Sequence, residues 1–341
     1  MSLILKTGLE KVDSSILNDT LQRNLFFTVY QSFEFYKLFK TQKNAIPSLF
    51  TVWDEERLTG SLIALRFSYK KGYPGFLADR TVIWGGPLLF GALEQQQKTL
   101  AILLDALIQE CGKKSAIIEF RNMCDLNEFT EIFSKFDFHF SGQMNCIIKV
   151  NKKEDVIEKM KPSKFRQIRK GLERGAVITE AENIGQVKEF YEILKVLYSE
   201  KVKKPLPDLS FFESFYYWGK QSEMGVLLLV MYEGKVIGGS LCPITKDREI
   251  FEWYTGALTK EYKLLYPGVL ATWAPIEYAL NHYIPLYNLM GIGKPEIAYG
   301  VRNFKVQFGG DVVNYGRFRR INNPKLFKLT KAGYRLMGFR E

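Results

Sequence analysis

The chain has 341 residues, of which 46% are hydrophobic, 14% aromatic and 25% charged, and this globular composition at this length predicts two domains. No apolar run is long enough to span a membrane, and the N-terminal stretch, which contains Glu10 and Asp13, does not predict a secretory signal. The four cysteines form no CxxC pair and the two histidines lie far apart, so the sequence predicts neither a metal site, nor disulfides, nor a histidine-based triad. A reducing cytoplasm is the expected compartment.

The net charge is 48 − 37 = +11, and the excess is concentrated in two segments. Residues 159–174 hold seven basic residues against one acidic residue, and residues 317–341 hold eight against one. Such clusters favour an anionic partner, which would be a phosphorylated substrate, a nucleic acid backbone or an anionic membrane surface. A solvated basic face explains the same charge equally well.

The first half predicts a short strand, a helix, and then a packed helix over the aromatic stretch 25–40. Residues 48–54 and 58–69 predict a hairpin, which is followed by a strand at 81–90 with a Gly-Gly-Pro break. An amphipathic helix is expected over Leu93 to Cys111, and a buried strand at 115–120.

The second half repeats this order. A helix at 212–220 precedes a hairpin at 225–244, and a strand at 249–258, a helix at 269–283 and a strand at 285–292 follow. Gly60-Ser61 matches Gly239-Ser240 at an offset of 179 residues. The shared order of elements predicts two copies of one α/β unit with a mixed sheet.

Between the two copies, residues 159–174 predict a helix that starts at Pro162. Its expected apolar stripe consists of Phe165, Ile168 and Leu172. Gly171 is interpreted as tolerated within the helix, and Gly175 is expected to cap it.

Residues 287–318 form the stretch around which we expect the protein to be organised. They predict the end of a buried strand, a loop with Gly291 and Gly293, a short segment with Phe304-Lys305, and a strand over 312–318. Lys305 lies among apolar neighbours, and the nearest acidic residue in the sequence is Asp311. Such a lysine either lays its stem along a core with its head in water or directs its charge at a group that becomes negative.

The segment VLATWAPIEYALNHYIPLYNLMGI, together with NFKVQFGGDVVNY, resembles the FemAB family, whose members transfer amino acids from aminoacyl-tRNA to the stem peptide of peptidoglycan precursors. The resemblance extends to VYQSFEFYK, PSKFRQIRKG, VMYEGKVIGGS and EWYTGA. It implies tandem N-acetyltransferase-like (GNAT) domains, in a short form without a coiled-coil insertion. The expected domains are residues 1–144 and 145–316, with 317–341 packing back on the first.

The resemblance also implies roles for individual residues. Lys305 falls on a lysine that stabilises the oxyanion of the tetrahedral intermediate, and Phe304 would keep the head of this lysine in a drier position. Lys37 matches a lysine that contacts the acceptor phosphates, and Tyr254 matches a tyrosine of the same groove.

Two positions depart from the family pattern. Leu206 replaces an expected arginine, and Arg121 replaces an expected acidic residue. The phosphates of the acceptor would then be held by Arg166, Arg169 or Arg121.

The resemblance implies aminoacyl-tRNA as donor co-substrate, no other cofactor, and a nucleotide- or lipid-linked cell-wall precursor as acceptor. The enzyme would be cytoplasmic. The basic C-terminal segment with Phe327, Leu329, Leu336 and Phe339 would rest on the inner face of the membrane, or form a basic helix packed on the first domain.

Two other functions remain open. The first is an acyl-CoA-dependent N-acyltransferase that acts on a polysaccharide or amino sugar; the loops IWGGPLLFG and KEYKLLYPGVL lack the Q/R-x-x-G-x-G/A pattern that binds the CoA pyrophosphate, which counts against it. The second is a non-catalytic nucleic-acid-binding module, for which the sequence shows charge but no recognised motif.

Overall fold

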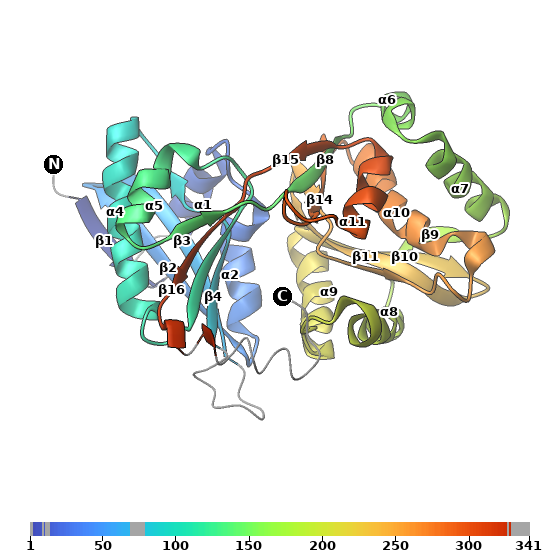
Figure 1. Cartoon of the computed structure of the whole chain (residues 1–341), viewed down its shortest axis with the longest axis horizontal. Coiled ribbons are helices and arrows are strands. Elements are labelled where there is room, and N and C mark those ends of the chain that lie inside the picture. Colours follow the sequence, from blue (N-terminus) through green and yellow to red (C-terminus); the bar gives the residue numbers. More distant parts are fainter. Residues whose placement is uncertain (1–2, 9, 11–13, 69–78, 326, 329–341) are drawn as a thin grey trace. The chain divides into compact units, whose positions relative to one another are not determined.

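The computed structural model describes residues 3–8, 10, 14–68, 79–325 and 327–328 (Figure 1). The chain divides into two compact units. The first contains Met1–Gly142 and the segment that begins at Tyr315, and the second contains Gln143–Asn314. Each unit has one mixed sheet of eight strands within the described residues.

The sheet of the first unit has the order β1-β2-β3-β4-β6-β16-β7, with β5 paired to β3. Only the pair β4 and β6 is parallel. The elements are β1 (Leu3–Thr7), α1 (Ser14–Gln22), η2 (Val29–Gln31), α2 (Phe33–Lys40), β2 (Ala45–Asp54), β3 (Arg57–Phe67), β4 (Arg80–Gly85), β5 (Leu88–Leu89), α4 (Leu93–Cys111), β6 (Ile117–Asn122), η3 (Asn127–Phe129), α5 (Thr130–Lys135), β7 (His139–Ser141) and β16 (Arg317–Ile321).

The sheet of the second unit has the order β9-β10-β11-β12-β14-β8-β15, with β13 paired to β11, and only β12 and β14 are parallel. The elements are β8 (Asn145–Lys149), α6 (Lys153–Lys159), α7 (Pro162–Glu173), β9 (Val177–Glu180), α8 (Ile184–Leu197), η4 (Tyr198–Val202), α9 (Leu209–Ser222), β10 (Gly225–Tyr232), β11 (Lys235–Thr245), β12 (Glu249–Phe251), β13 (Tyr254–Ala257), η5 (Lys263–Leu265), α10 (Pro267–Asn281), β14 (Leu286–Gly291), α11 (Gly300–Lys305), η6 (Val306–Phe308) and β15 (Asp311–Val313).

The two sheets share one order and one set of strand orientations, which confirms the predicted repeat of an α/β unit. Both hairpins also carry a register shift at the same place, after Val52 in the first unit and after Val230 in the second. Val52 pairs with Gly60 and Val230 pairs with Gly238. The true offset is therefore 238 − 60 = 178, and the predicted match of Gly60 with Gly239 is wrong by one residue.

Each sheet contains a strand that pairs with strands far from it in the sequence. β8 follows β7 in sequence but pairs with β14, and β16 follows β15 but pairs with β6 and β7. The predicted strand over 312–318 is therefore wrong, because it divides into β15 and β16 in different sheets. Gly316 permits the turn between them: its φ is +64°, and a Cβ there would lie 2.2 Å from the Phe140 ring.

Two predicted helices need correction. The helix predicted over 25–40 begins only at Phe33, because the Ser32 side chain accepts a hydrogen bond from the Phe35 N–H and starts it there. In α7, Leu172 is 37% exposed, and the buried residues are Lys164, Ile168 and Gly171. Gly171 is required rather than tolerated, because a Cβ would lie 2.5 Å from the Leu265 carbonyl oxygen.

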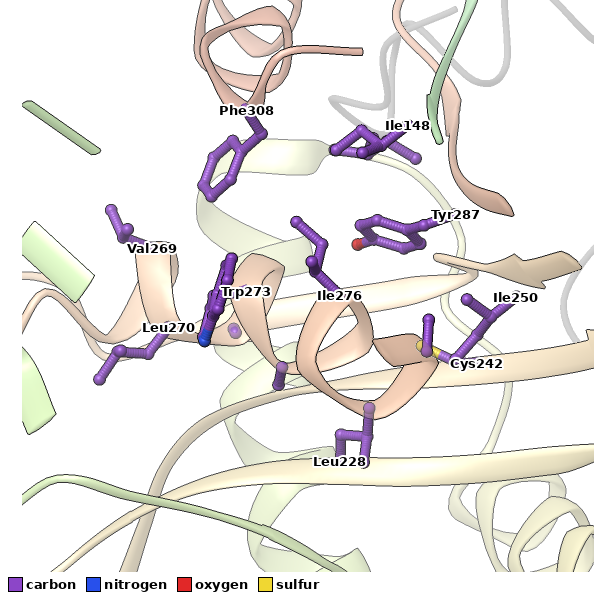
Figure 2. Packing of buried hydrophobic residues seen from close by; sticks show 14 of the residues in the cluster. Ile148, Leu228, Cys242, Ile250, Val269, Leu270, Trp273, Ile276, Tyr287 and Phe308 are labelled. Carbon is purple, nitrogen blue, oxygen red and sulfur yellow. The ribbon is translucent and has the colours of Figure 1, made fainter. Parts of the chain in front are cut away.

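The core of the second unit is built around α10, which is apolar on nearly all sides (Figure 2). Trp273 and Ile276 of this helix pack among Tyr287, Phe308 and Ile148, which come from three different segments. Within the described residues no helix is both long and apolar enough to cross a membrane. Leu329, Leu336 and Phe339 of the predicted membrane segment lie outside the described residues.

Candidate active site

Lys305 ends α11 and is only 8% exposed. Its Nζ lies 2.7 Å from Glu252 Oε1, and it also donates a hydrogen bond to the Leu289 carbonyl oxygen. The hydroxyl of Tyr287 donates to the other oxygen of Glu252 at 2.7 Å. The acidic neighbour of Lys305 is thus Glu252 and not Asp311, which instead lies 3.8 Å from Lys149.

Glu252 reaches this position because the strand predicted over 249–258 is interrupted. Its first part, β12, pairs with both β11 and β14, whereas its second part, β13, pairs with β11 but not with β14. At the interruption, Glu252 N–H donates to the Asn288 carbonyl at 2.8 Å and Trp253 N–H donates to the Leu241 carbonyl at 3.1 Å. The two halves of the strand thus separate at the residue whose carboxylate meets Lys305.

Two contacts fix the ammonium group of Lys305. An ammonium group has three N–H donors; one of them donates to the Leu289 carbonyl, whereas Glu252 Oε1 is an ion-pair partner and not a hydrogen-bond acceptor of this group. Because Glu252 is 3% exposed, it offsets most of the lysine charge in a place with little water. The Lys305 ammonium is therefore held in place by these two contacts rather than moving freely.

Phe304 contacts a second buried lysine that the sequence analysis did not single out. The Nζ of Lys164 lies 4.4 Å from the centre of the Phe304 ring and 5.9 Å from that of Phe308. Burial, and after it the charge of Lys161, lowers the pKa of Lys164. In the sequence Lys164 looks like any basic residue of a surface helix, so only its contact with the Phe304 ring identifies it.

Arg302 organises the loop that precedes α11. Its guanidinium donates to the carbonyls of Ile292 at 3.2 Å, Pro295 at 3.5 Å and Lys294. A single side chain thus fixes the path of the chain between β14 and the Phe-Lys pair. Arg302 could not be identified from the sequence, because nothing local to it indicates which carbonyls it will meet.

The other predicted site residues of the second unit are less confined. Tyr254 is partly buried among Phe211, Phe212 and Trp253, with ring-centre distances of 6.1, 5.3 and 5.6 Å. Arg166 is exposed on α7, and Arg169 is exposed with its Nε 3.2 Å from Glu173 Oε1.

Lys37 and Arg121 belong to the first unit. Lys37 is 60% exposed, and its Nζ lies 2.9 Å from Glu34 Oε1. Arg121 is more enclosed: its Nε donates to Glu119 Oε1 at 2.7 Å, and its guanidinium lies 5.0 Å from the centre of the Trp84 ring.

The four cysteines are buried and unpaired. Burial raises the pKa of Cys124 to about 12 and that of Cys146 to about 11, so both thiols keep their protons at neutral pH. In the part of the chain that the structure describes, no group of three or more His, Cys, Asp and Glu residues is placed to hold a metal ion.

The FemAB family model matches residues 233–335, the segment that holds Glu252, Tyr254 and the Phe-Lys pair. Among solved structures, FemX superposes with a TM-score of 0.71 at 14% identity, over 95% of this chain and 99% of FemX. A tandem GNAT protein from the clavulanic acid biosynthesis pathway gives 0.54 at 9% identity, with coverage of 95% and 99%. L-PGS from Bacillus licheniformis gives 0.52 at 13% identity, with coverage of 81% and 87%.

No curated protein sequence matches the chain. At these identities the solved structures establish the fold, and the family model adds the match in the segment that holds Lys305. The chain thus has the fold of tandem GNAT proteins, and its residues 233–335 match the FemAB family model.

Proposed function

We propose that the protein transfers an aminoacyl group from aminoacyl-tRNA to the amine of a peptidoglycan-precursor-type acceptor, and that Lys305 is its central catalytic residue. The observation that carries this proposal is the buried ammonium of Lys305, which Glu252 and the Leu289 carbonyl hold in place within the segment matched by the FemAB model. The acceptor would be nucleotide- or lipid-linked, and the reaction would take place in the cytoplasm, at the inner membrane face for a lipid-linked acceptor.

The proposed reaction needs little acid–base machinery. The deprotonated acceptor amine attacks the ester carbonyl, the carbonyl oxygen becomes negative, and the intermediate collapses to an amide as the tRNA hydroxyl leaves with the proton from the amine. The spare N–H of Lys305 would stabilise the negative oxygen, and one such donor typically contributes roughly 3–4 kcal/mol to the barrier. The remaining requirement is alignment of the two substrates.

Tyr254 and a set of basic residues are proposed to position the acceptor. Tyr254 lies two residues after Glu252, on the strand that follows the interruption. Lys37, Arg121, Arg166 and Arg169 are the candidates for its phosphates. Phe304 would act indirectly. Its ring packs against that of Phe308, with 5.4 Å between the ring centres, and would keep water away from the neighbouring ammonium of Lys305.

The start of α10 favours tRNA over acyl-CoA as donor. A pyrophosphate binds a helix N-terminus through accessible backbone N–H groups. Here the first position of α10 is Pro267, which has no N–H. In addition, α7 approaches the preceding turn closely at Gly171, and Arg174 donates to the Leu264 carbonyl at 2.6 Å. Acyl-CoA-dependent transfer to a polysaccharide, amino sugar or other cell-envelope amine remains the alternative.

Binding measurements on the intact chain with aminoacyl-tRNA and with acetyl-CoA test the donor. We expect saturable binding of aminoacyl-tRNA that weakens steeply as salt is raised, because phosphate contacts release counterions. Changing Lys161 and Lys170, exposed residues of the basic segment 159–174, to Gln should weaken it, whereas changing Lys135, which is 62% exposed on the first unit, should not. Tight acetyl-CoA binding without tRNA binding would contradict the proposal. Equal binding of uncharged tRNA without any transfer would favour the non-catalytic module.

A further inference from the structure

Three arginines gather around one carboxylate on the sheet of the first unit. Glu119 Oε1 accepts from Arg121 Nε at 2.7 Å and from Arg317 Nη1 at 3.1 Å, and its Oε2 accepts from Arg319 Nε at 2.5 Å. Glu119 and Arg121 lie on β6, and Arg317 and Arg319 lie on the neighbouring strand β16. We call these four residues the arginine cluster.

The cluster contains three positive charges and one negative charge. Arg121 and Arg317 face each other directly across β6 and β16, an arrangement in which like charges destabilise a sheet. The side chains of Arg121, Arg317 and Arg319 are only 25%, 23% and 34% exposed. Burial, opposed by Glu119 but reinforced by the other two guanidiniums, lowers the pKa of Arg317 to about 10.

Glu119 remains ionised and can neutralise only one of the three charges. Burial alone would raise its pKa, but the charges of the three arginines hold the pKa well below its usual range. Within the described residues, no second carboxylate forms an ion pair with Arg121, Arg317 or Arg319. A net charge of two therefore remains partly withdrawn from water, where an unpaired charge is unfavourable.

The cluster also has the geometry of an anion-binding site. Each arginine uses one N–H on Glu119, which aligns the three guanidiniums and leaves their other donors available. Across the sheet, Trp84 of β4 lies opposite Arg121, and Ser141 of β7 lies opposite Arg317. The indole and the hydroxyl are therefore on the same face of the sheet as the arginines. The opposite face carries Phe120 and Phe318, which are packed in the core.

We propose that Arg121, Arg317 and Arg319, held in register by Glu119, bind a phosphate-type dianion, and that this dianion is the diphosphate of the acceptor. The guanidinium fork matches phosphate oxygens in pairs, and two unbalanced positive charges match a dianion. Lys37 is a weaker candidate because it is exposed and already paired with Glu34. The assignment to the acceptor rests on the proposed function; the anion site itself does not.

Titration calorimetry of the intact chain with inorganic pyrophosphate at low salt tests the site. We expect one saturable site, and we expect Arg317→Gln to weaken binding by roughly ten-fold or more, because hydrogen bonds to charged groups are worth about 1.5–3 kcal/mol. Arg121→Gln should have a similar effect. Arg320→Gln is the matched control: Arg320 lies on the same strand but donates to the Phe136 carbonyl on the other face, so pyrophosphate affinity should not change.

Absence of saturable pyrophosphate binding to the wild-type chain would overturn the proposal, and so would an equal loss in Arg317→Gln and Arg320→Gln, since that would reflect net charge alone. Parallel titrations with a nucleoside diphosphate and with farnesyl diphosphate distinguish the sources. Tighter binding of the first supports a nucleotide-linked acceptor, and tighter binding of the second supports a lipid-linked one. No acyl donor is present, so a failed transfer assay would contradict the proposed function without affecting this result.

Discussion

At the scale of single residues, the pairing of Lys305 with Glu252 changes what a substitution can reveal. Lys305→Ala would remove the proposed oxyanion donor, but it would also leave Glu252 buried without its counter-charge. Breaking a buried ion pair from one side destabilises a protein by about 3–5 kcal/mol. A fall in activity of the single variant could then reflect unfolding as well as lost catalysis.

We therefore predict the outcome for a pair of variants. Lys305→Ala should lower kcat by roughly 10²–10³ with little change in acceptor Kd, because the donor acts on charge that exists only in the transition state. It should also lower Tm. Adding Glu252→Gln should restore much of the Tm, since both charges are then gone, and should restore none of the kcat.

Measurements of kcat, acceptor Kd and Tm on the two variants check this prediction, with Lys37→Ala as the comparison variant. Lys37→Ala should mainly weaken acceptor binding if that residue contacts phosphates. Recovery of kcat together with Tm in the double variant would assign Lys305 a structural role and would remove the basis of the proposed mechanism.

At the scale of elements, the interrupted strand places a second carboxylate in a partly buried position. Glu249 begins β12 and accepts a hydrogen bond from Asn288 Nδ2 at 2.9 Å. Burial raises the pKa of Glu249 to about 7, although the hydrogen bond from Asn288 opposes the shift. Asn288 also accepts from the Met290 N–H at 2.9 Å and so holds the bend at the end of β14. Ionisation of Glu249 therefore bears on the strand that carries the Leu289 carbonyl.

The pH dependence follows from the direction of this shift. A carboxyl group whose pKa is about 7 in the folded state and 4.5 in the unfolded state binds its proton more tightly when folded. The stability it contributes is full below pH 4.5 and is lost as the pH rises through about 7. Glu249→Gln should thus raise the free energy of unfolding at pH 8 by at most about 3 kcal/mol, and should change it little at pH 5.

Urea unfolding of the wild-type chain and of Glu249→Gln at pH 5 and pH 8 measures this effect. Glu128→Gln on the first unit serves as a control, because it removes an exposed carboxylate. The prediction fails if Glu249→Gln has the same effect on stability at both pH values. Because Gln keeps the oxygen that accepts from Asn288, loss of that hydrogen bond would not explain a difference.

Elements that follow from local pattern were predicted well. Helix α4 has the predicted bounds, since its apolar periodicity is continuous, and the turn of the second hairpin has Glu233 and Gly234 at positive φ. The strands over 249–258 and 312–318 were predicted as continuous because strand propensity does not show where a pairing partner changes. Propensity is a local property, whereas the partner of a strand is decided by distant segments.

The candidate site could be predicted only in part for the same reason. The Phe-Lys pair is visible in the sequence, but Glu252 lies far from Lys305 along the chain. The separation between Glu119 and Arg317 is 198 residues, so the arginine cluster exists only once β16 pairs with β6. Lys164 and Arg302 likewise acquire their contacts from packing and not from neighbours in sequence.

At the scale of the whole molecule, the first unit is not one continuous stretch of chain, because β16 follows the second unit in sequence. β16 lies between β6 and β7, and its Phe318 stacks on Phe133 with a ring-centre distance of 4.0 Å. Without β16, both neighbouring strands lose a partner along an entire edge. Glu119 would also lose two of its three arginines.

We therefore predict that a chain ending at Asn314 keeps a folded second unit and an unfolded or loosened first unit. The second unit retains all eight of its strands, whereas the first loses β16 from the interior of its sheet. Limited proteolysis followed by mass spectrometry should recover a protected fragment close to Gln143–Asn314 and should cleave readily within Met1–Gly142. A chain ending at Lys328 retains β16 and should be protected in both units to the same extent as the full chain. Equal protection of Met1–Gly142 in the chain that ends at Asn314 would show that β16 is dispensable, and would exclude the arginine cluster as a structural requirement of the first unit.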